Sequence, residues 1–137
     1  MPPDLSRRAV LEMPGIEHVR FRRDICFRTN TESAGMMLDL YHLGTAPDAH
    51  PVPVVVYCRG YADPSGLIRT TGMADSWARL LAASGDAVAV YADREPAADL
   101  CCVIHYLTTN GIALGLDAER LALFSTSGNV PTAPLVV

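Results

Sequence analysis

Residues 54–58 read Val-Val-Val-Tyr-Cys, and residues 87–91 read Ala-Val-Ala-Val-Tyr. Each is an unbroken apolar run of strand length, which is typical of a strand covered by other elements on both faces. Between them, residues 71–84 carry apolar side chains at helical spacing and end before Gly85. This strand–helix–strand order predicts parallel strands joined by a right-handed crossover.

The same order repeats toward the C-terminus. Pro96 opens a second predicted helix with its apolar side chains on one face, and Leu121–Phe124 follows as a third apolar strand. Upstream, Val19, Phe21, Ile25 and Phe27 alternate with charged residues, which predicts one strand with these four on a single face. A polar turn at 29–35 and an apolar run at 37–43 complete an antiparallel hairpin.

The predicted fold is therefore α/β. It has a mixed, mostly parallel sheet with an N-terminal antiparallel hairpin, and helices on both faces. We expect an N-terminal arm at residues 1–17 and one domain at residues 18–137, a common size for a single domain.

Composition narrows the function classes. The net charge of −4 favours no nucleic-acid partner, and all 11 basic residues are arginine, which excludes a P-loop or Schiff-base lysine. No secretory leader or membrane-length apolar run is visible, and the four cysteines show no metal spacing. These features predict a cytoplasmic protein with buried free thiols, no metal and no cofactor.

A candidate catalytic motif follows the last predicted strand. A strand that enters a helix through small-x-Ser-x-small has the geometry of a nucleophile elbow, in which a sharp turn exposes the serine hydroxyl. Here the five residues are Ser125, Thr126, Ser127, Gly128 and Asn129. Ser127 is the candidate nucleophile, while Ser125 and Asn129 stand where glycine is usual. The alternative is a strand-to-helix loop capped by Ser127 or Asn129.

Three further segments strengthen the first interpretation. Residues 53–61 resemble a strand leading to an oxyanion loop, residues 77–90 resemble the following helix and strand, and residues 114–128 resemble the lead-in to an elbow. In this order and spacing the chain resembles the α/β-hydrolase superfamily, in particular its small esterase and dienelactone-hydrolase-like branches. The similarity runs from about His18 to Asn129 and covers only the N-terminal portion of that fold.

The resemblance implies acyl transfer on a small carboxylic ester or related substrate. Ser127 would attack the carbonyl, and the backbone amides of Gly128 and Tyr61 would hold the oxyanion. Arg59 replaces the histidine that is usual in that loop, and its role is open. Cys58 stands nearby, and we interpret it as a buried structural thiol rather than a nucleophile.

A serine nucleophile needs a base, and the family order is serine, acid, histidine. Residues 128–137 contain neither an acid nor a histidine, and all four histidines precede Ser127 (His18, His42, His50 and His105). We interpret Asp93 and Asp99 as solvated or helix-start carboxylates. The sequence therefore predicts a truncated serine hydrolase that is inactive as an isolated chain.

Two other functions are weighed against it. The first is a non-catalytic hydrolase-like module that pairs with a second copy or a complementing chain through the open sheet edge of its last strand. The second is a doubly wound nucleotide-binding domain, which the missing GxGxxG motif and the leading hairpin argue against.

Overall fold

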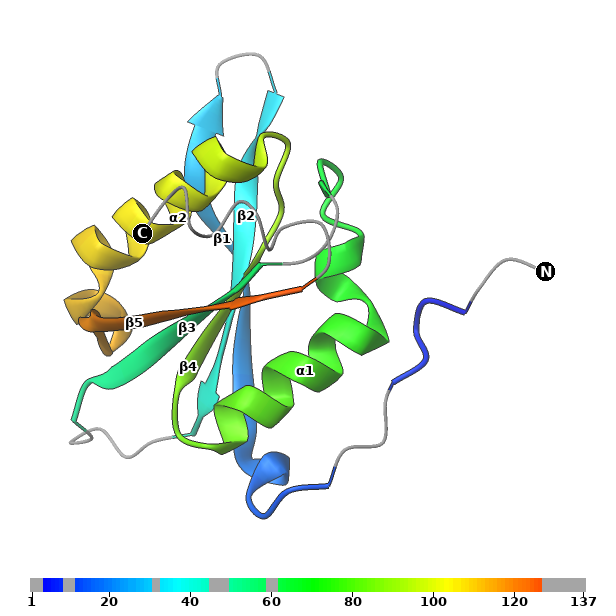
Figure 1. Ribbon diagram of the computed structural model, residues 1–137, viewed down its shortest axis with the longest axis vertical. Helices are drawn as coiled ribbons and strands as arrows, with labels where there is room; N and C mark the ends of the chain where they lie inside the picture. The colour runs from blue at the N-terminus through cyan, green and yellow to red at the C-terminus, as the bar shows by residue number, and fades with distance from the viewer. Residues whose placement is uncertain (1–3, 9–11, 31–32, 45–49, 59–61, 127–137) are drawn as a thin grey trace.

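The computed structural model describes residues 4–8, 12–30, 33–44, 50–58 and 62–126. A five-stranded sheet in the order β1-β2-β4-β3-β5 forms its centre. Helix α1 covers one face of this sheet and α2 the other (Figure 1). Strands β1 and β2 are antiparallel to their neighbours, whereas β4, β3 and β5 run parallel. The predicted mixed α/β sheet with a leading hairpin is confirmed.

The hairpin strands are longer than expected, β1 spanning Val19–Asn30 and β2 Ser33–Leu43. The prediction that Val19, Phe21, Ile25 and Phe27 share one face of β1 is wrong. The β1–β2 register shifts between Arg22 and Ile25, where Asp24 adopts a left-handed backbone with φ of 60°. Because a bulge of this kind exchanges the two faces of a strand, Val19 packs on the α1 side, whereas Ile25 and Phe27 pack on the α2 side.

The first crossover matches the sequence closely. Strand β3 spans Val52–Cys58, α1 spans Gly72–Ala83 and β4 spans Ala87–Tyr91. Thr71 caps α1 by accepting a hydrogen bond from the Ala74 N–H at 3.3 Å. After the helix, Gly85 has φ of 110°, a backbone angle that side chains rarely allow, so the chain can turn into the buried β4.

The second crossover contains α2 at Pro96–Asn110 and β5 at Leu116–Ser125. Strand β5 begins earlier than the sequence predicted and pairs only with β3 among the described strands. Asp99 lies in the first turn of α2, which confirms the helix-start interpretation, but it is fully buried rather than solvated. It accepts hydrogen bonds from the N–H groups of Arg94 at 2.7 Å and Glu95 at 2.9 Å, and it pairs with Arg28 of β1.

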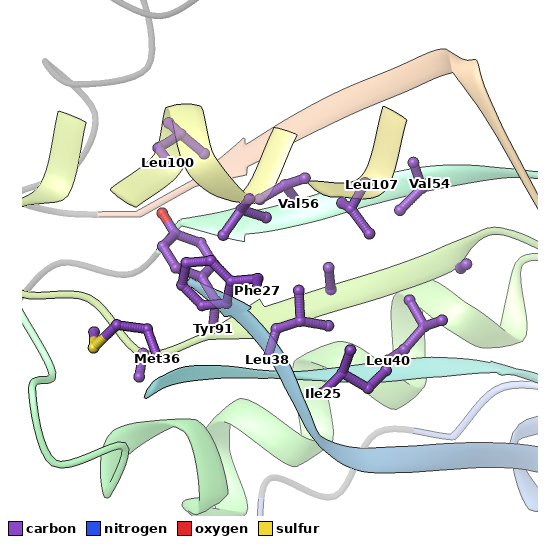
Figure 2. Close-up of a cluster of buried hydrophobic side chains, with 14 of the residues drawn as sticks. Ile25, Phe27, Met36, Leu38, Leu40, Val54, Val56, Tyr91, Leu100 and Leu107 are labelled. Atoms are coloured by element: carbon purple, nitrogen blue, oxygen red, sulfur yellow. The ribbon is translucent and has the colours of Figure 1, made fainter. Parts of the chain in front are cut away.

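Two hydrophobic clusters fill the spaces between the sheet and its helices. On the α2 side, Leu100 and Leu107 of the helix pack over Val54 and Val56 of β3 and Leu38 of β2 (Figure 2). On the α1 side, small residues of α1 lie against the other face of the sheet, and Trp77 stacks on Phe124 with ring centroids 5.6 Å apart. The sheet that carries the candidate site is therefore supported on both faces.

The cysteines only partly follow the sequence expectation. All four are free thiols and Cys58 is buried. Cys26 and Cys102 are half-buried, and Cys101 on α2 is exposed, so the prediction that all are buried is wrong. The short apolar run that contains Cys101 belongs to a helix, in which only one stripe of side chains faces the sheet.

Candidate active site

The carboxyl ends of β4, β3 and β5 lie side by side at one edge of the sheet. Cys58 ends β3 opposite Ser125, which ends β5. The ladder continues one residue further, because the Thr126 N–H donates to the Cys58 carbonyl at 2.9 Å. The chain thus leaves β3 and β5 at neighbouring points, in the region where ligands commonly bind in open α/β sheets.

The central residues of the predicted site lie outside the described residues. These are Ser127, Gly128 and Asn129 after β5, and Arg59 and Tyr61 after β3. The described residue nearest to the candidate nucleophile along β5 is Ser125, which is half-buried. Its hydroxyl is buried and has no hydrogen-bond partner among the described residues. Ser125 lies at the carboxyl edge of the sheet, opposite Cys58.

Asp63 and Asp93 form a contact at this edge that the sequence did not reveal. Asp93 follows β4 and is 1% exposed, so its interpretation as a solvated or helix-start carboxylate is wrong. The Asp63 N–H donates to the Asp93 carbonyl at 2.8 Å and to Asp93 Oδ1 at 2.9 Å. These two hydrogen bonds hold Asp63 against Asp93, which follows β4. Asp63 lies in a turn-rich segment of the sequence, so no periodicity could indicate its burial.

A partly buried ionic cluster continues from this contact toward the hairpin. The Arg69 N–H donates to Asp63 Oδ2 at 3.0 Å, and its guanidinium pairs with Asp39 of β2 and with Asp24 at 2.8 Å. Arg23 also pairs with Asp39, at 2.7 Å. Asp39 is fully buried, and its charge is compensated by the guanidiniums of Arg69 and Arg23, since a buried carboxylate without such partners would be costly. The bulge in β1 brings Asp24 within reach of Arg69.

Another buried carboxylate, Asp75, lies in the first turn of α1. It accepts hydrogen bonds from the Tyr41 hydroxyl at 3.0 Å and from Arg79 Nε at 2.9 Å, and it pairs with Arg8 at 3.2 Å. Burial raises the pKa of the Tyr41 hydroxyl well above its ordinary value, and the charge and hydrogen bond of Asp75 raise it further. Tyr41 thus remains a neutral donor in this network at physiological pH.

Three of the four histidines lie far from the carboxyl edge. His18 precedes β1, His42 pairs opposite Arg20, and His50 precedes β3, so all three belong to the opposite, amino edge of the sheet. The seven residues of β3 separate the two edges by about 20 Å at about 3.3 Å per residue. His105 is exposed in the middle of α2. No described histidine is therefore placed to act as a base beside Ser125.

The described residues contain neither a metal-binding cluster nor a membrane-spanning helix. No group of three or more histidine, cysteine, aspartate or glutamate side chains is arranged to hold a metal ion in that part of the chain. Within the same residues, neither α-helix has the length and apolar character needed to cross a bilayer.

The structure is similar to solved structures of several esterases. The chain matches a bacterial heroin esterase with a TM-score of 0.63 and 20% identity over 80% of this chain and 36% of that one. It matches brefeldin A esterase, described as a bacterial homologue of human hormone-sensitive lipase, with a TM-score of 0.70 and 16% identity. This match covers 96% of this chain and 38% of that one. It matches a hyperthermophilic esterase from the archaeon Pyrobaculum calidifontis with a TM-score of 0.63 and 19% identity, over 86% of this chain and 37% of that one.

These matches define the fold. The described residues have the α/β-hydrolase fold, and they correspond to its N-terminal portion, since the chain spans less than half the length of each of these esterases. No protein-family model and no curated protein sequence matches the chain.

Proposed function

We propose that the chain is the nucleophile-bearing part of a serine hydrolase that cleaves a small carboxylic ester or a related acyl substrate. Ser127 is the nucleophile, and the backbone amides of Gly128 and Tyr61 stabilise the oxyanion. The acid and the histidine come from residues outside these 137, either in the same polypeptide or in a complementing chain. The isolated chain of 137 residues is inactive.

One observation carries this proposal. The Thr126 N–H donates a hydrogen bond to the Cys58 carbonyl, so the chain leaves β5 and β3 at neighbouring points. A serine that follows Thr126 and an amide that follows Cys58 then start from adjacent points, as nucleophile and oxyanion donor must. The strand order and the esterases that share this fold support the same chemistry. The remote histidines explain why the base has to be supplied from elsewhere.

The test starts with the coding sequence beyond the Val137 codon. We expect it to encode an acid and then a histidine, and we expect Ser127 in the encoded product to react stoichiometrically with a fluorophosphonate. Ser127→Ala should abolish labelling, whereas Ser84→Ala at the exposed end of α1 should not change it. A folded product that contains both groups and leaves Ser127 unlabelled contradicts the proposal.

The alternative function is a non-catalytic module that pairs through β5. It is favoured by one observation, that β5 is the last strand in the order of the described sheet and pairs there with β3 alone. Such a strand offers a row of backbone donors and acceptors to a second copy or a complementing chain. This function takes the lead if the reading frame stops at Val137. Ser127→Ala would then leave partner binding unchanged.

A further inference from the structure

The N-terminal arm and the start of α1 enclose a pocket of about 570 Å³, a size that is common for small-molecule sites. The proposed function assigns no role to this pocket. Its lining comes from the arm, from the short helix η2 (Ile68–Thr70) and from the first residues of α1 with their cap. The lining residues are Asp4, Leu5, Arg7, Arg8, Ile68, Thr71 and Met73.

Two contacts hold the arm in place as one wall of the pocket, beside the start of α1 (Figure 1). The Gly72 N–H donates to the Leu5 carbonyl at 2.9 Å, and Arg8 Nε pairs with the buried carboxylate of Asp75 at 3.2 Å. The wall is therefore built by the chain itself. A ligand that enters a pocket of this kind does not have to order it, which lowers the entropic cost of binding.

The apolar part of the pocket is exposed rather than packed. Leu5 is 48% exposed and Met73 is 51% exposed, although both are large apolar side chains. Ile68, which lines the same pocket, is half-buried. An apolar ligand that covers these side chains removes their surface from water, and this is the main driving force for binding apolar molecules.

The charged side chains of the pocket carry an excess of positive charge, since the guanidiniums of Arg7 and Arg8 are opposed by the single carboxylate of Asp4. Asp4 Oδ1 already accepts hydrogen bonds from the Ser6 N–H at 3.0 Å and the Ser6 hydroxyl at 2.6 Å. Arg8 is paired with Asp75. The Arg7 guanidinium has no ion pair or hydrogen bond with any described residue. In a chain of net charge −4, such a cation beside an apolar wall favours an anionic ligand.

The uncharged polar side chain of the pocket, Thr71, is already bonded on both sides. Its hydroxyl donates to the Ile68 carbonyl at 2.9 Å and accepts the Ala74 N–H at 3.3 Å. The Arg7 guanidinium is therefore the polar group that the pocket has left to bind the charged end of a ligand.

We propose that the pocket between the arm and α1 binds an amphipathic carboxylate, of the class of medium-chain fatty acids. The apolar chain lies against Leu5, Ile68 and Met73, and the carboxylate pairs with Arg7, whose planar guanidinium matches its geometry. Ester hydrolysis releases a carboxylic acid, but the inference goes beyond the proposed function, because none of the lining residues belongs to the proposed catalytic machinery.

The experiment measures binding of radiolabelled octanoate to the 137-residue chain by equilibrium dialysis at pH 7. We expect saturable binding of one molecule per chain, weakened by salt because Arg7 is exposed. Octan-1-ol, which has the same chain length without the charge, should bind several times more weakly, and acetate should not bind. The proposal is overturned if octanoate does not saturate the chain, or if octanol binds as tightly.

Matched variants test the charged and apolar parts separately. Arg7→Ala should weaken octanoate binding about 5-fold without changing octanol binding. Arg22→Ala, which removes another exposed arginine that has no ion pair with a described residue, should change neither. Met73→Glu should weaken octanoate binding about 10-fold or more, because it places a like charge in the apolar wall. A carboxylate in the first turn of α1 favours the helix, so this variant should fold. Ile112→Glu, at another exposed apolar residue, is its control.

Gly72→Ala tests the arm as a wall, because a Cβ there would lie 2.6 Å from the Arg7 carbonyl oxygen and must displace the arm. It should weaken octanoate and octanol alike. An Arg22→Ala or Ile112→Glu variant that loses as much binding as its pocket counterpart overturns the proposed site, as does unchanged binding in Arg7→Ala or in Gly72→Ala. A failure of Ser127 to react with esters would overturn the proposed function alone, since octanoate binding is measured without catalysis.

Discussion

At the scale of single residues, the buried hydroxyl of Tyr41 links stability to alkaline pH. Its pKa is raised in the folded state by burial and by Asp75, whereas in the unfolded chain it returns to about 10. Between these two values the native state keeps a proton that the unfolded state has lost. The free energy of unfolding therefore falls as pH rises above about 10, by at most about 1.4 kcal/mol per pH unit from this group.

The predicted outcome is that the cost of Tyr41→Phe becomes smaller as pH rises. At pH 9 the substitution removes a hydrogen bond to Asp75 and should destabilise by about 1 kcal/mol. Above pH 10 the wild type loses stability that the phenylalanine variant keeps. The chain has no lysine, and arginine stays protonated in this range, so the titration of basic side chains does not obscure the effect.

Urea denaturation at pH 9, 10 and 11 measures this difference. Asp75→Asn is the second variant, because it keeps Tyr41 buried and removes the neighbouring charge. Its loss of stability between pH 9 and 11 should be smaller than that of the wild type. A cost of Tyr41→Phe that is the same at pH 9 and pH 11 would contradict the prediction.

At the scale of elements, the bulge in β1 separates two phenylalanines that a simple alternation places together. Phe27 is buried on the α2 side, with its ring 6.2 Å from that of Tyr91. Phe21 is 44% exposed on the α1 side, beneath the guanidiniums of Arg23 at 4.6 Å and Arg79 at 5.3 Å. Deletion of the two rings should therefore have very different costs.

We expect Phe27→Ala to destabilise the fold by about 3–5 kcal/mol, since it leaves a cavity under α2. Phe21→Ala should cost only about 1 kcal/mol, which corresponds to its exposed cation–π contacts. The free energy of unfolding from urea denaturation distinguishes the two variants. Equal costs would mean that β1 continues without a change of face.

The start of α1 makes a close contact with the N-terminal arm. The Gly72 N–H donates to the Leu5 carbonyl at 2.9 Å, and a Cβ at Gly72 would lie 2.6 Å from the Arg7 carbonyl oxygen. Because the obstructing atoms are backbone, Gly72→Ala must displace residues 5–8 from the helix. Trypsin should then cleave after Arg7 and Arg8 several times faster.

Gly44→Ala is the matched control, since a Cβ there meets only ordinary contacts, the nearest at 3.5 Å. Its cleavage after Arg7 and Arg8 should match that of the wild type. An unchanged cleavage rate in Gly72→Ala would show that the arm does not depend on this contact.

The elements show what the sequence could predict. Strand β4 and helix α1 follow from apolar runs and caps that act locally, so their predicted and observed bounds nearly coincide. The face change in β1 occurs at Asp24, which pairs with Arg69, 45 residues away, and no local pattern contains this contact. The burial of Asp93 could not be predicted either, because its partner Asp63 comes from another loop, 30 residues away. Contacts between distant loops, rather than periodicity, hold the described part of the candidate site.

At the scale of the whole molecule, the order of the sheet leaves β5 paired with β3 alone among the described strands. Its half-buried side chains include Leu121 and Leu123, which pack at the margin of the α2-side cluster. The charged residues of β5 all lie in its first half, at Asp117, Glu119 and Arg120. The second half therefore has no charge to oppose edge-to-edge pairing, and we expect the 137-residue chain to self-associate.

A lysine in this second half should prevent the association. Ala122 is exposed in the middle of the apolar stretch, so Ala122→Lys adds a charge beside the edge without emptying the core. Sedimentation velocity should show dimers or larger species for the wild type and a monomer for this variant. Ala98→Lys, at an exposed position of α2, adds the same charge elsewhere and should associate like the wild type. A wild-type chain that sediments as a single monomer and unfolds cooperatively would contradict association through β5 and would remove the main support for the non-catalytic alternative.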